Sequence, residues 1–144
     1  MASRNFNQVK LLWLQAMSAY DIRARLVMSN TTIGTQDDAS IANIDDFTTV
    51  DVCDGASYAD VALTSEAFAK DDANDWATFD AADVTFAGLG VGTRQTVGML
   101  LYRYVDGTDA NDVPLCYFEF SGAVTHDGTD FTVRFNETGV LKLA

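Results

Sequence analysis

The chain has 144 residues, of which 21 are acidic and 9 are basic, so its formal net charge at pH 7 is −12. Its length and its apolar content of 48% are sufficient for a folded domain with its own core, and we expect a single domain over residues 1–144. The charge argues against a nucleic-acid or anionic-membrane partner, since both are bound through clustered Lys and Arg, and no apolar run approaches the ~18 residues of a membrane span.

Residues 6–20 have the pattern of an amphipathic helix. The side chains that recur at steps of three and four residues are Phe6, Val9, Trp13, Met17 and Tyr20. Three leucines outside this stripe, Leu11, Leu12 and Leu14, make the apolar surface wider than one flat packing surface requires. We expect the helix to be used entirely in the core of its own domain. The alternative is that it contacts both its own sheet and a partner.

After the helix the apolar period changes to two, which predicts a half-buried strand over residues 22–28. Arg23 and Arg25 alternate with the apolar residues of this strand, so we expect both on its solvent-exposed face. The following segment, residues 30–46, is polar and lacks either period. It predicts a long loop or an extended arm, a length of connection that is usually functional or mobile.

The second half of the sequence is a series of short extended segments separated by turns. The expected strands lie within residues 58–68, 74–79, 84–86, 95–105, 115–120, 131–135 and 140–143. Asp-Gly pairs at 54–55, 106–107 and 127–128 are typical of hairpin turns. We therefore predict a mainly β protein, an antiparallel β-sandwich or open barrel with one N-terminal α-helix.

The negative charge is expected in the turns, because 18 of the 21 acidic residues are Asp, whose short carboxylate bonds nearby backbone N–H groups. Such loops can chelate Ca²⁺, and irregular sites at Asp106, Asp109 and Asp112, or at Asp127 and Asp130, stay open as alternatives. The first segment fails the EF-hand pattern at its fifth, sixth and twelfth positions. Solvated turns are the favoured interpretation.

No pattern predicts catalysis. His126 is the only histidine and is interpreted as a loop residue, since no GxSxG elbow accompanies it. Cys53 and Cys116 are far apart and show no metal-ligand spacing, which favours two free, buried thiols over a disulfide. We expect a protein that is not an enzyme and has no cofactor and no metal site.

The linear order of motifs resembles that of tailed-bacteriophage structural proteins of this size. After the helix and its strand, the matching segments are residues 44–47, 55–63, 79–86, 97–104, 114–120 and 131–143. They include the step Asp80-Ala81-Ala82-Asp83-Val84-Thr85-Phe86, a strand that ends Leu101-Tyr102-Arg103, and a final aromatic-to-glycine-to-aliphatic strand. The resemblance covers nearly the whole chain and contains no catalytic signature.

The resemblance implies a virion structural protein of the capsid decoration, or cement, type. Such a protein is made in the host cytoplasm and then lies on the outer surface of the virion capsid, where it stabilises the DNA-filled head. Its implied partners are the major capsid protein and neighbouring copies of itself, with a trimer weakly favoured over other homo-oligomers. A tail or head–tail connector protein is the nearest alternative.

Four basic residues are candidates for contact with the particle: Arg4, Lys10, Arg23 and Arg25. An otherwise acidic protein has to meet its partner without repulsion, and these residues supply positive charge near the N-terminus. An alternative of another class is a secreted carbohydrate- or Ca²⁺-binding β-sandwich module that uses the aromatic residues Trp76, Tyr102 and Tyr104.

Overall fold

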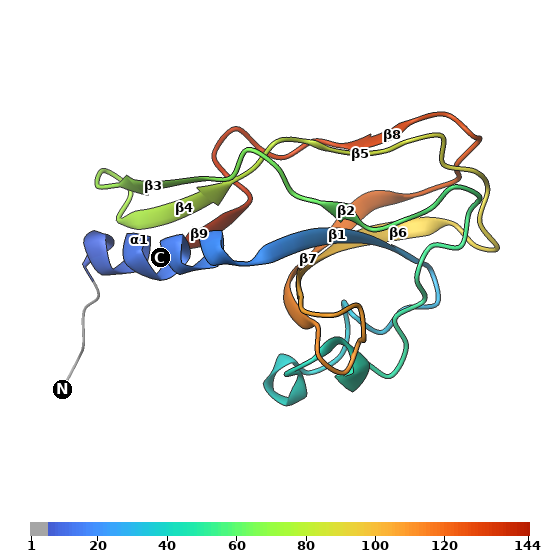
Figure 1. Ribbon diagram of the computed structural model, residues 1–144, viewed down its shortest axis with the longest axis horizontal. Coiled ribbons are helices and arrows are strands. Elements are labelled where there is room, and N and C mark those ends of the chain that lie inside the picture. Colours follow the sequence, from blue (N-terminus) through green and yellow to red (C-terminus); the bar gives the residue numbers. More distant parts are fainter. Residues whose placement is uncertain (1–5) are drawn as a thin grey trace. The chain divides into compact units, whose positions relative to one another are not determined.

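The computed structural model describes residues 6–144, which fall into two compact units. Residues 6–20, 63–83 and 133–144 form the first unit, and residues 21–62 and 84–132 form the second. Each unit is therefore assembled from segments that lie far apart in the sequence (Figure 1). No helix in the described part of the chain has both the length and the apolar character needed to cross a membrane.

The first unit is a helix on a small antiparallel sheet. The helix α1 (Asn7–Gln15) continues as a 3₁₀ turn (Ala16–Ala19), and the sheet has the order β3 (Ala67–Asp71), β4 (Trp76–Asp80) and β9 (Leu141–Leu143). α1 packs on β3 and β4, and it runs beside them in Figure 1. Ala77 and Phe79 of β4 are completely buried and form the centre of this unit.

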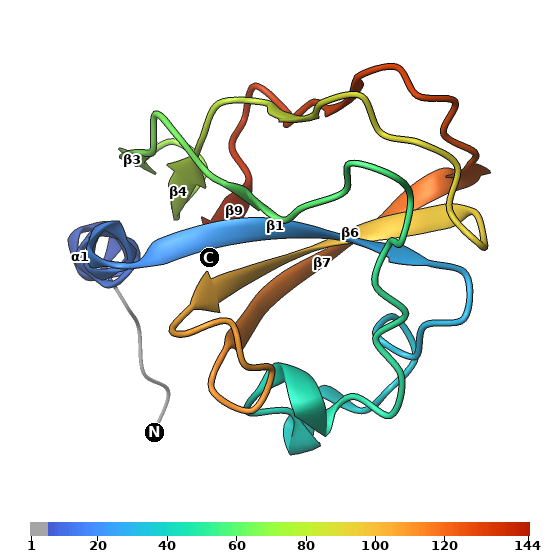
Figure 2. The same cartoon turned by 45° about the vertical axis from the view of Figure 1, so that its right-hand side comes forward.

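The second unit is built on a four-stranded antiparallel sheet. Its strand order is β2 (Val61–Ala62), β1 (Asp21–Met28), β6 (Thr96–Tyr104) and β7 (Val113–Val124), and Figure 2 shows β1, β6 and β7 side by side. A two-stranded sheet of β5 (Val84–Phe86) and β8 (Phe131–Val133) accompanies it. Phe131 of β8 meets Phe120 of β7 edge-on and so joins the two sheets, while Phe86 of β5 stacks on Tyr58 in the segment before β2.

The fold class agrees with the prediction: the protein is mainly β, with antiparallel, sandwich-like sheets and one N-terminal helix. Each predicted extended segment contains a strand, because the period of two is strong in this half of the chain. The Asp106-Gly107 turn joins the paired strands β6 and β7 as expected. Asp127-Gly128 is not a hairpin turn, because β7 pairs with β6 whereas β8 pairs with β5.

The long segment 30–46 is a loop, but it is not an extended arm. It contains only two short 3₁₀ turns, Asp38–Ser40 and Ile44–Asp46. Ile33 and Ile44 are buried and belong to one apolar cluster with Val27, Leu100 and Tyr102 of the sheet. These two isoleucines hold the loop on the sheet, since leaving the cluster would expose their apolar surface.

Candidate functional site

Two of the four predicted contact residues lie on β1, and the expectation that both face solvent is wrong for Arg25. Arg25 is only 8% exposed. Its guanidinium donates from Nε to Oδ2 of Asp60 at 2.9 Å and from Nη1 to Oδ1 of Asp109 at 2.7 Å.

Arg23 is half-buried and pairs with Asp21 at the start of the same strand. Both arginines lie over tyrosine rings of β6, Arg23 over Tyr104 and Arg25 over Tyr102.

Asp60 connects Arg25 to two tyrosine hydroxyls. Tyr102 donates to Oδ2 of Asp60 at 2.6 Å and Tyr58 donates to Oδ1 at 2.7 Å. Burial, followed by the neighbouring Asp60, raises the pKa of both tyrosines, so they stay protonated donors. Burial opposes the charge of Arg25, but its hydrogen bonds and attraction to Asp109 and Asp60 raise its pKa overall. This network fixes two loops on the sheet and leaves no free charge for a partner at Arg25.

The other two contact candidates are Lys10 and Arg4. Lys10 is 4% exposed, and its ammonium donates to the carbonyl of Asp75 at 2.7 Å and to side-chain oxygens of Asp75 and Asn7 at 3.3 Å. It therefore fastens α1 to the turn between β3 and β4 rather than pointing outward. Arg4 lies outside the described residues. A contact role for these residues stays a prediction, and only Arg23 of the three described ones is not buried.

Helix α1 presents an unexpected face to solvent. The predicted core stripe lies largely outside: Phe6 is 70% and Trp13 is 53% exposed, and Leu12 beside them is 55% exposed. The buried side of the helix is that of Lys10 and Leu14. The expectation that the helix is used entirely in the core of its own domain is therefore wrong. The side with Lys10 is the buried one, because the Lys10 ammonium has its hydrogen-bond acceptors in the β3–β4 turn. We call Phe6, Leu12 and Trp13 the apolar helix face.

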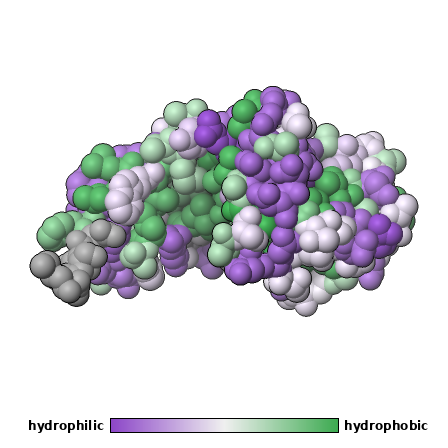
Figure 3. Space-filling view, turned by 90° about the horizontal axis from the view of Figure 1, so that it is seen from below, coloured by the Kyte–Doolittle hydropathy of each residue, from purple (hydrophilic) through white to green (hydrophobic). Residues whose placement is uncertain are grey.

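Figure 3 shows green, hydrophobic surface around α1. Among the described residues, six large hydrophobic side chains are exposed, and four of them belong to residues 6–20. No acidic residue occurs before Asp21, so all 21 carboxylates lie after this segment. The apolar helix face is thus also the least acidic part of the chain.

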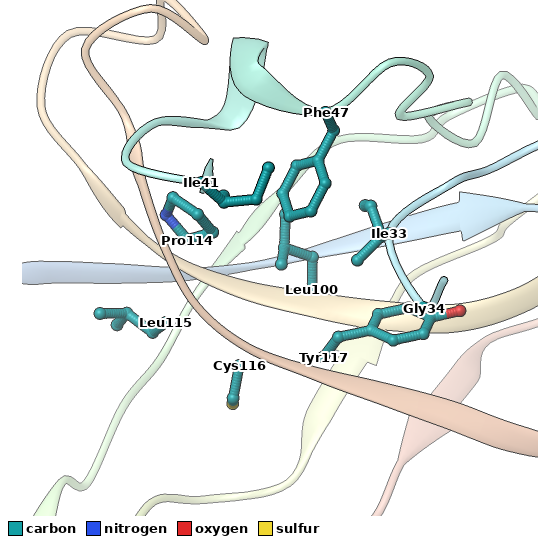
Figure 4. A pocket seen from close by; sticks show the side chains of 9 residues that line it. All are labelled: Ile33, Gly34, Ile41, Phe47, Leu100, Pro114, Leu115, Cys116 and Tyr117. Carbon is teal, nitrogen blue, oxygen red and sulfur yellow. The ribbon is translucent and has the colours of Figure 1, made fainter. Parts of the chain in front are cut away.

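The second unit holds a partly open cavity of about 460 Å³ between the 30–46 loop and the strands β6 and β7. We call it the loop pocket; it is lined by Ile33, Gly34, Ile41, Phe47, Leu100, Pro114, Leu115, Cys116 and Tyr117. In Figure 4, the side chains of Ile41, Phe47 and Leu100 gather at its centre and the ring of Tyr117 reaches toward Gly34. Its lining side chains are aliphatic and aromatic, but more of the surface that it opens to solvent is polar than apolar.

Two glycines make room for the Tyr117 ring. A Cβ atom on Gly98 would lie 2.3 Å from Oη of Tyr117, and one on Gly34 would lie 3.2 Å from Cε1 of the same ring. A side chain at Gly98 would therefore displace the ring that forms one wall of the loop pocket. Sequence analysis missed this pocket; the signal available was the isolated apolar residues Ile33, Ile41 and Phe47 in a polar segment.

Both cysteines are free thiols, as expected, although only Cys53 is fully buried. Burial raises the pKa of Cys116 to about 12, so its thiol is protonated at neutral pH. In Figure 4, its sulfur points away from Phe47. Cys116 is therefore a residue that contributes to packing.

The aspartates act as turn-forming groups. In residues 6–144, no group of three Asp, Glu, His or Cys side chains is placed to hold a metal ion. Of the Ca²⁺ candidates, Asp109 pairs with Arg25, Asp112 is buried and accepts from the backbone N–H of Val105, and Asp127 accepts from the N–H of Thr129. Such hydrogen bonds hold the pKa of Asp127 below its usual range.

The aromatic residues considered for a carbohydrate site are each covered by a cation. Lys142 lies over the ring of Trp76 at 4.3 Å, Arg25 over Tyr102 at 4.7 Å and Arg23 over Tyr104 at 3.5 Å. Tyr102 is moreover only 1% exposed. A sugar-stacking platform needs an open ring face, and a cation occupies one face of each of these rings.

Comparison with protein-family models, curated proteins and solved structures found no match to this chain.

Proposed function

We propose that this protein is a non-enzymatic virion structural protein of a tailed phage, of the capsid decoration type. It binds the outer capsid surface in many copies and ties neighbouring capsomers together, so that added interface opposes the pressure of the packaged DNA. The order of sequence motifs resembles that of such proteins, and a β fold with an exposed apolar helix face suits the role.

The observation that carries the proposal is the apolar helix face on a segment without carboxylates. A protein of net charge −12 repels further copies of itself and any acidic shell. Contact with another acidic surface is least opposed where this protein carries no carboxylates. Apolar and aromatic side chains also form the core of protein interfaces. Leu12 and Trp13, both more than half exposed on residues 6–20, meet both conditions.

The rest of the chain supports a coating role through its aspartates. Asp37, Asp71, Asp106 and Asp127 each accept a hydrogen bond from the backbone N–H two residues later, which fixes the turns in which they lie. Their charges remain at the surface, where they keep unassembled copies soluble and apart.

Gel densitometry of purified particles against the major capsid protein tests the proposal. A copy number comparable with that of the capsid protein supports a decoration role. A few or a few dozen copies would assign the protein to the tail or connector, and failure to sediment with particles would remove both virion roles. Trp13→Ser should lower the copy number, while the matched control Val91→Ser, at a position 65% exposed, should leave it unchanged.

The basic contact prediction is tested on Arg4 and Arg23. Charge reversal at Lys10 or Arg25 would place a carboxylate at a buried position and confound binding with folding. If Arg4→Glu with Arg23→Glu leaves particle binding and its salt dependence intact, these residues are not part of the contact.

A further inference from the structure

We infer that the outer edge of β7 binds an extended, basic segment of a partner protein, which joins the four-stranded sheet as an added strand. The segment pairs with the backbone of Tyr117 and Glu119, places an apolar side chain in the loop pocket and carries a Lys or Arg two residues away from it. The inference stands apart from the proposed function, because this edge belongs to the second unit and the apolar helix face belongs to the first.

β7 is the last strand of its sheet, with β6 on one side and no strand of residues 6–144 on the other (Figure 2). It is also the longest strand in this part of the chain, at 12 residues. Natural proteins usually shorten such an edge or protect it with several charged residues. β7 has one charged residue, Glu119, and its proline, Pro114, is at the second position of the strand. Most of its outer edge is therefore open to pairing.

The hydrogen bonds of β1 determine the direction of the backbone groups across the sheet. The N–H of Leu26 donates to Oη of Tyr58 at 2.8 Å, and the carbonyl of Leu26 accepts from the N–H of Cys53 at 3.0 Å. Both backbone groups of Leu26 thus face away from β6. The residue opposite Leu26 on β6 is Met99. In an antiparallel pair without mutual hydrogen bonds, both residues face away from each other, so the backbone groups of Met99 face β7.

The same alternation assigns the outer edge of β7. Met99 is opposite Phe118, so the N–H and C=O of Phe118 face β6. The backbone groups of its two neighbours, Tyr117 and Glu119, therefore face outward. Outside the β6–β7 ladder, no hydrogen bond within residues 6–144 reaches the backbone of either residue. We call the outward N–H and C=O groups of Tyr117 and Glu119 the free edge. It has the donors and acceptors with which an added strand pairs.

The loop pocket lies beside the free edge. Residues 114–117 of β7 line it together with the 30–46 loop, and in Figure 4 the strand that carries them passes along the pocket. Apart from the hydroxyl of Tyr117 and the thiol of Cys116, the lining side chains are apolar, so backbone groups supply polar surface at the opening. Extended peptides are bound in this way, with main-chain hydrogen bonds for affinity and a pocket for a side chain.

Charge favours a basic segment. No Lys or Arg occurs in residues 26–69 or 104–133, the two stretches that contain the loop and β7. Three of the exposed carboxylates in these stretches are those of Asp45, Asp46 and Glu119. They attract a segment with Lys or Arg and repel an acidic one. A second copy of this chain is disfavoured, because its own β7 brings another Glu119 and its net charge is −12.

Strand geometry sets the spacing within the segment. Side chains two residues apart lie on the same face of a strand, so Tyr117 and Glu119 share a face with Leu100, which is opposite Tyr117. An added strand therefore reaches the pocket and Glu119 with side chains that are two residues apart. The side chain at the pocket is apolar, and the one beside Glu119 is basic, since cross-strand pairs of opposite charge are stabilising.

The test uses a peptide, Lys-Thr-Val-Thr-Lys-Thr-Val, blocked at both ends, as the probe. It is titrated at low salt into the isotope-labelled full chain, and binding is followed through the amide NMR signals. We expect saturable binding with a Kd below about 1 mM. The amides of Tyr117 and Glu119 should exchange rapidly with solvent in the free protein and slowly in the complex, whereas that of Phe118 should be slow in both. Absence of saturable binding would overturn the inference.

Two N-methylated versions of the probe test strand addition on the unchanged protein. One carries the methyl groups on its Lys and Val residues, and the other carries them on its Thr residues. The N–H groups of a strand point alternately to its two edges, so one version loses its donors toward β7 and the other keeps them. One version should fail to bind and the other should bind like the parent peptide. Equal binding of both, or of neither, would mean that the probe does not add as a strand.

Variants of the protein separate the three parts of the contact. Glu119→Gln should weaken binding by about two- to fivefold, through the lost charge pair. Glu119→Pro also removes an outward N–H and leaves the β6–β7 ladder intact, so it should weaken binding by about a further fivefold. Ile41→Asp should weaken it by about tenfold or more. Val91→Asp, at an exposed position outside the pocket, should bind like the wild type.

Near-UV circular dichroism checks that each variant is folded. A probe with Glu in place of Lys should not bind, and an affinity equal to that of the parent would overturn the basic partner. Concentration-dependent protection of the Tyr117 and Glu119 amides without peptide would assign the edge to a second copy and overturn the inference. Trp13→Ser should bind the probe like the wild type, so failure of this inference and failure of the coat function are distinguishable.

Discussion

Nε of Arg25 donates a 2.9 Å hydrogen bond to Oδ2 of Asp60, although the two residues lie 35 positions apart. The pair joins the centre of β1 to the segment that leads into β2. Arg25 also reaches Asp109 in the turn between β6 and β7, so one guanidinium holds two connections against the same strand. The side chain of Arg25, which the sequence suggested as a surface contact, therefore holds the second unit together.

We predict that Arg25→Met lowers the free energy of unfolding by about 3 kcal/mol, because it leaves the largely buried Asp60 without its cation. Arg23→Met is the matched control on the same face of the strand. Its ion pair with Asp21 is considerably more exposed, so the expected loss is below about 1 kcal/mol. Urea unfolding of both variants measures the difference, and equal losses would mean that Arg25 has no special structural role.

The positions of the strands could be predicted from the sequence, but the buried and exposed faces of β1 and α1 could not. Alternation identified β1, but it could not reveal that loops cover the second face of that strand; burial of Arg25 depends on Asp60 and Asp109, which are remote in the sequence. Helical spacing identified α1 but not which side is buried, since apolar residues surround the helix. The buried side is the one that carries Lys10, because the hydrogen-bond acceptors of Lys10 lie in the β3–β4 turn, 65 positions away in the sequence.

The loop pocket could have been partly anticipated. Ile33 and Ile44 are isolated apolar residues in a polar loop, and both are buried in the sheet's core cluster. What could not be read from the sequence is the cavity itself, because it depends on where the ring of Tyr117 lies relative to Gly34 and Gly98.

Gly98→Ala should destabilise the protein by about 1–3 kcal/mol, because the new methyl group would overlap the Tyr117 ring. Gly122→Ala is the control: a Cβ there meets no atom within 4 Å, so the change should be neutral or slightly stabilising. Urea unfolding measures both. The double variant Gly98→Ala, Tyr117→Ser should recover most of the loss if ring overlap is the cause, and no recovery would point to the strand backbone instead.

Native protein should react slowly with a thiol reagent such as Ellman's reagent at pH 8. Cys53 is 4% exposed, and burial raises the pKa of Cys116 to about 12, which leaves little thiolate. In denaturant without reductant, both thiols should react at once, since neither is in a disulfide. A rapid native reaction, or fewer than two thiols after denaturation, would contradict the structure.

His126 gives stability a pH dependence above the range in which the carboxylates titrate. It is 6% exposed, its Nε2 lies 2.8 Å from Oγ1 of Thr96, and its ring meets Phe131 edge-on. Burial lowers its pKa below 6.5, while the nearby Asp127 partly opposes this shift. The folded state therefore prefers the neutral imidazole.

Because the unfolded chain binds the proton more readily, the free energy of unfolding should fall as the pH drops through about 6.5, and the loss should be complete below the folded-state pKa. Hydrogen bonds hold the pKa values of Asp46 and Asp106 below 3.8, so these carboxylates add to this loss only at lower pH. His126→Gln cannot titrate and should give a nearly constant melting temperature over the same range. Melting curves of both proteins between about pH 8 and pH 5 measure the difference, and parallel curves would mean that His126 protonates without cost in the folded state.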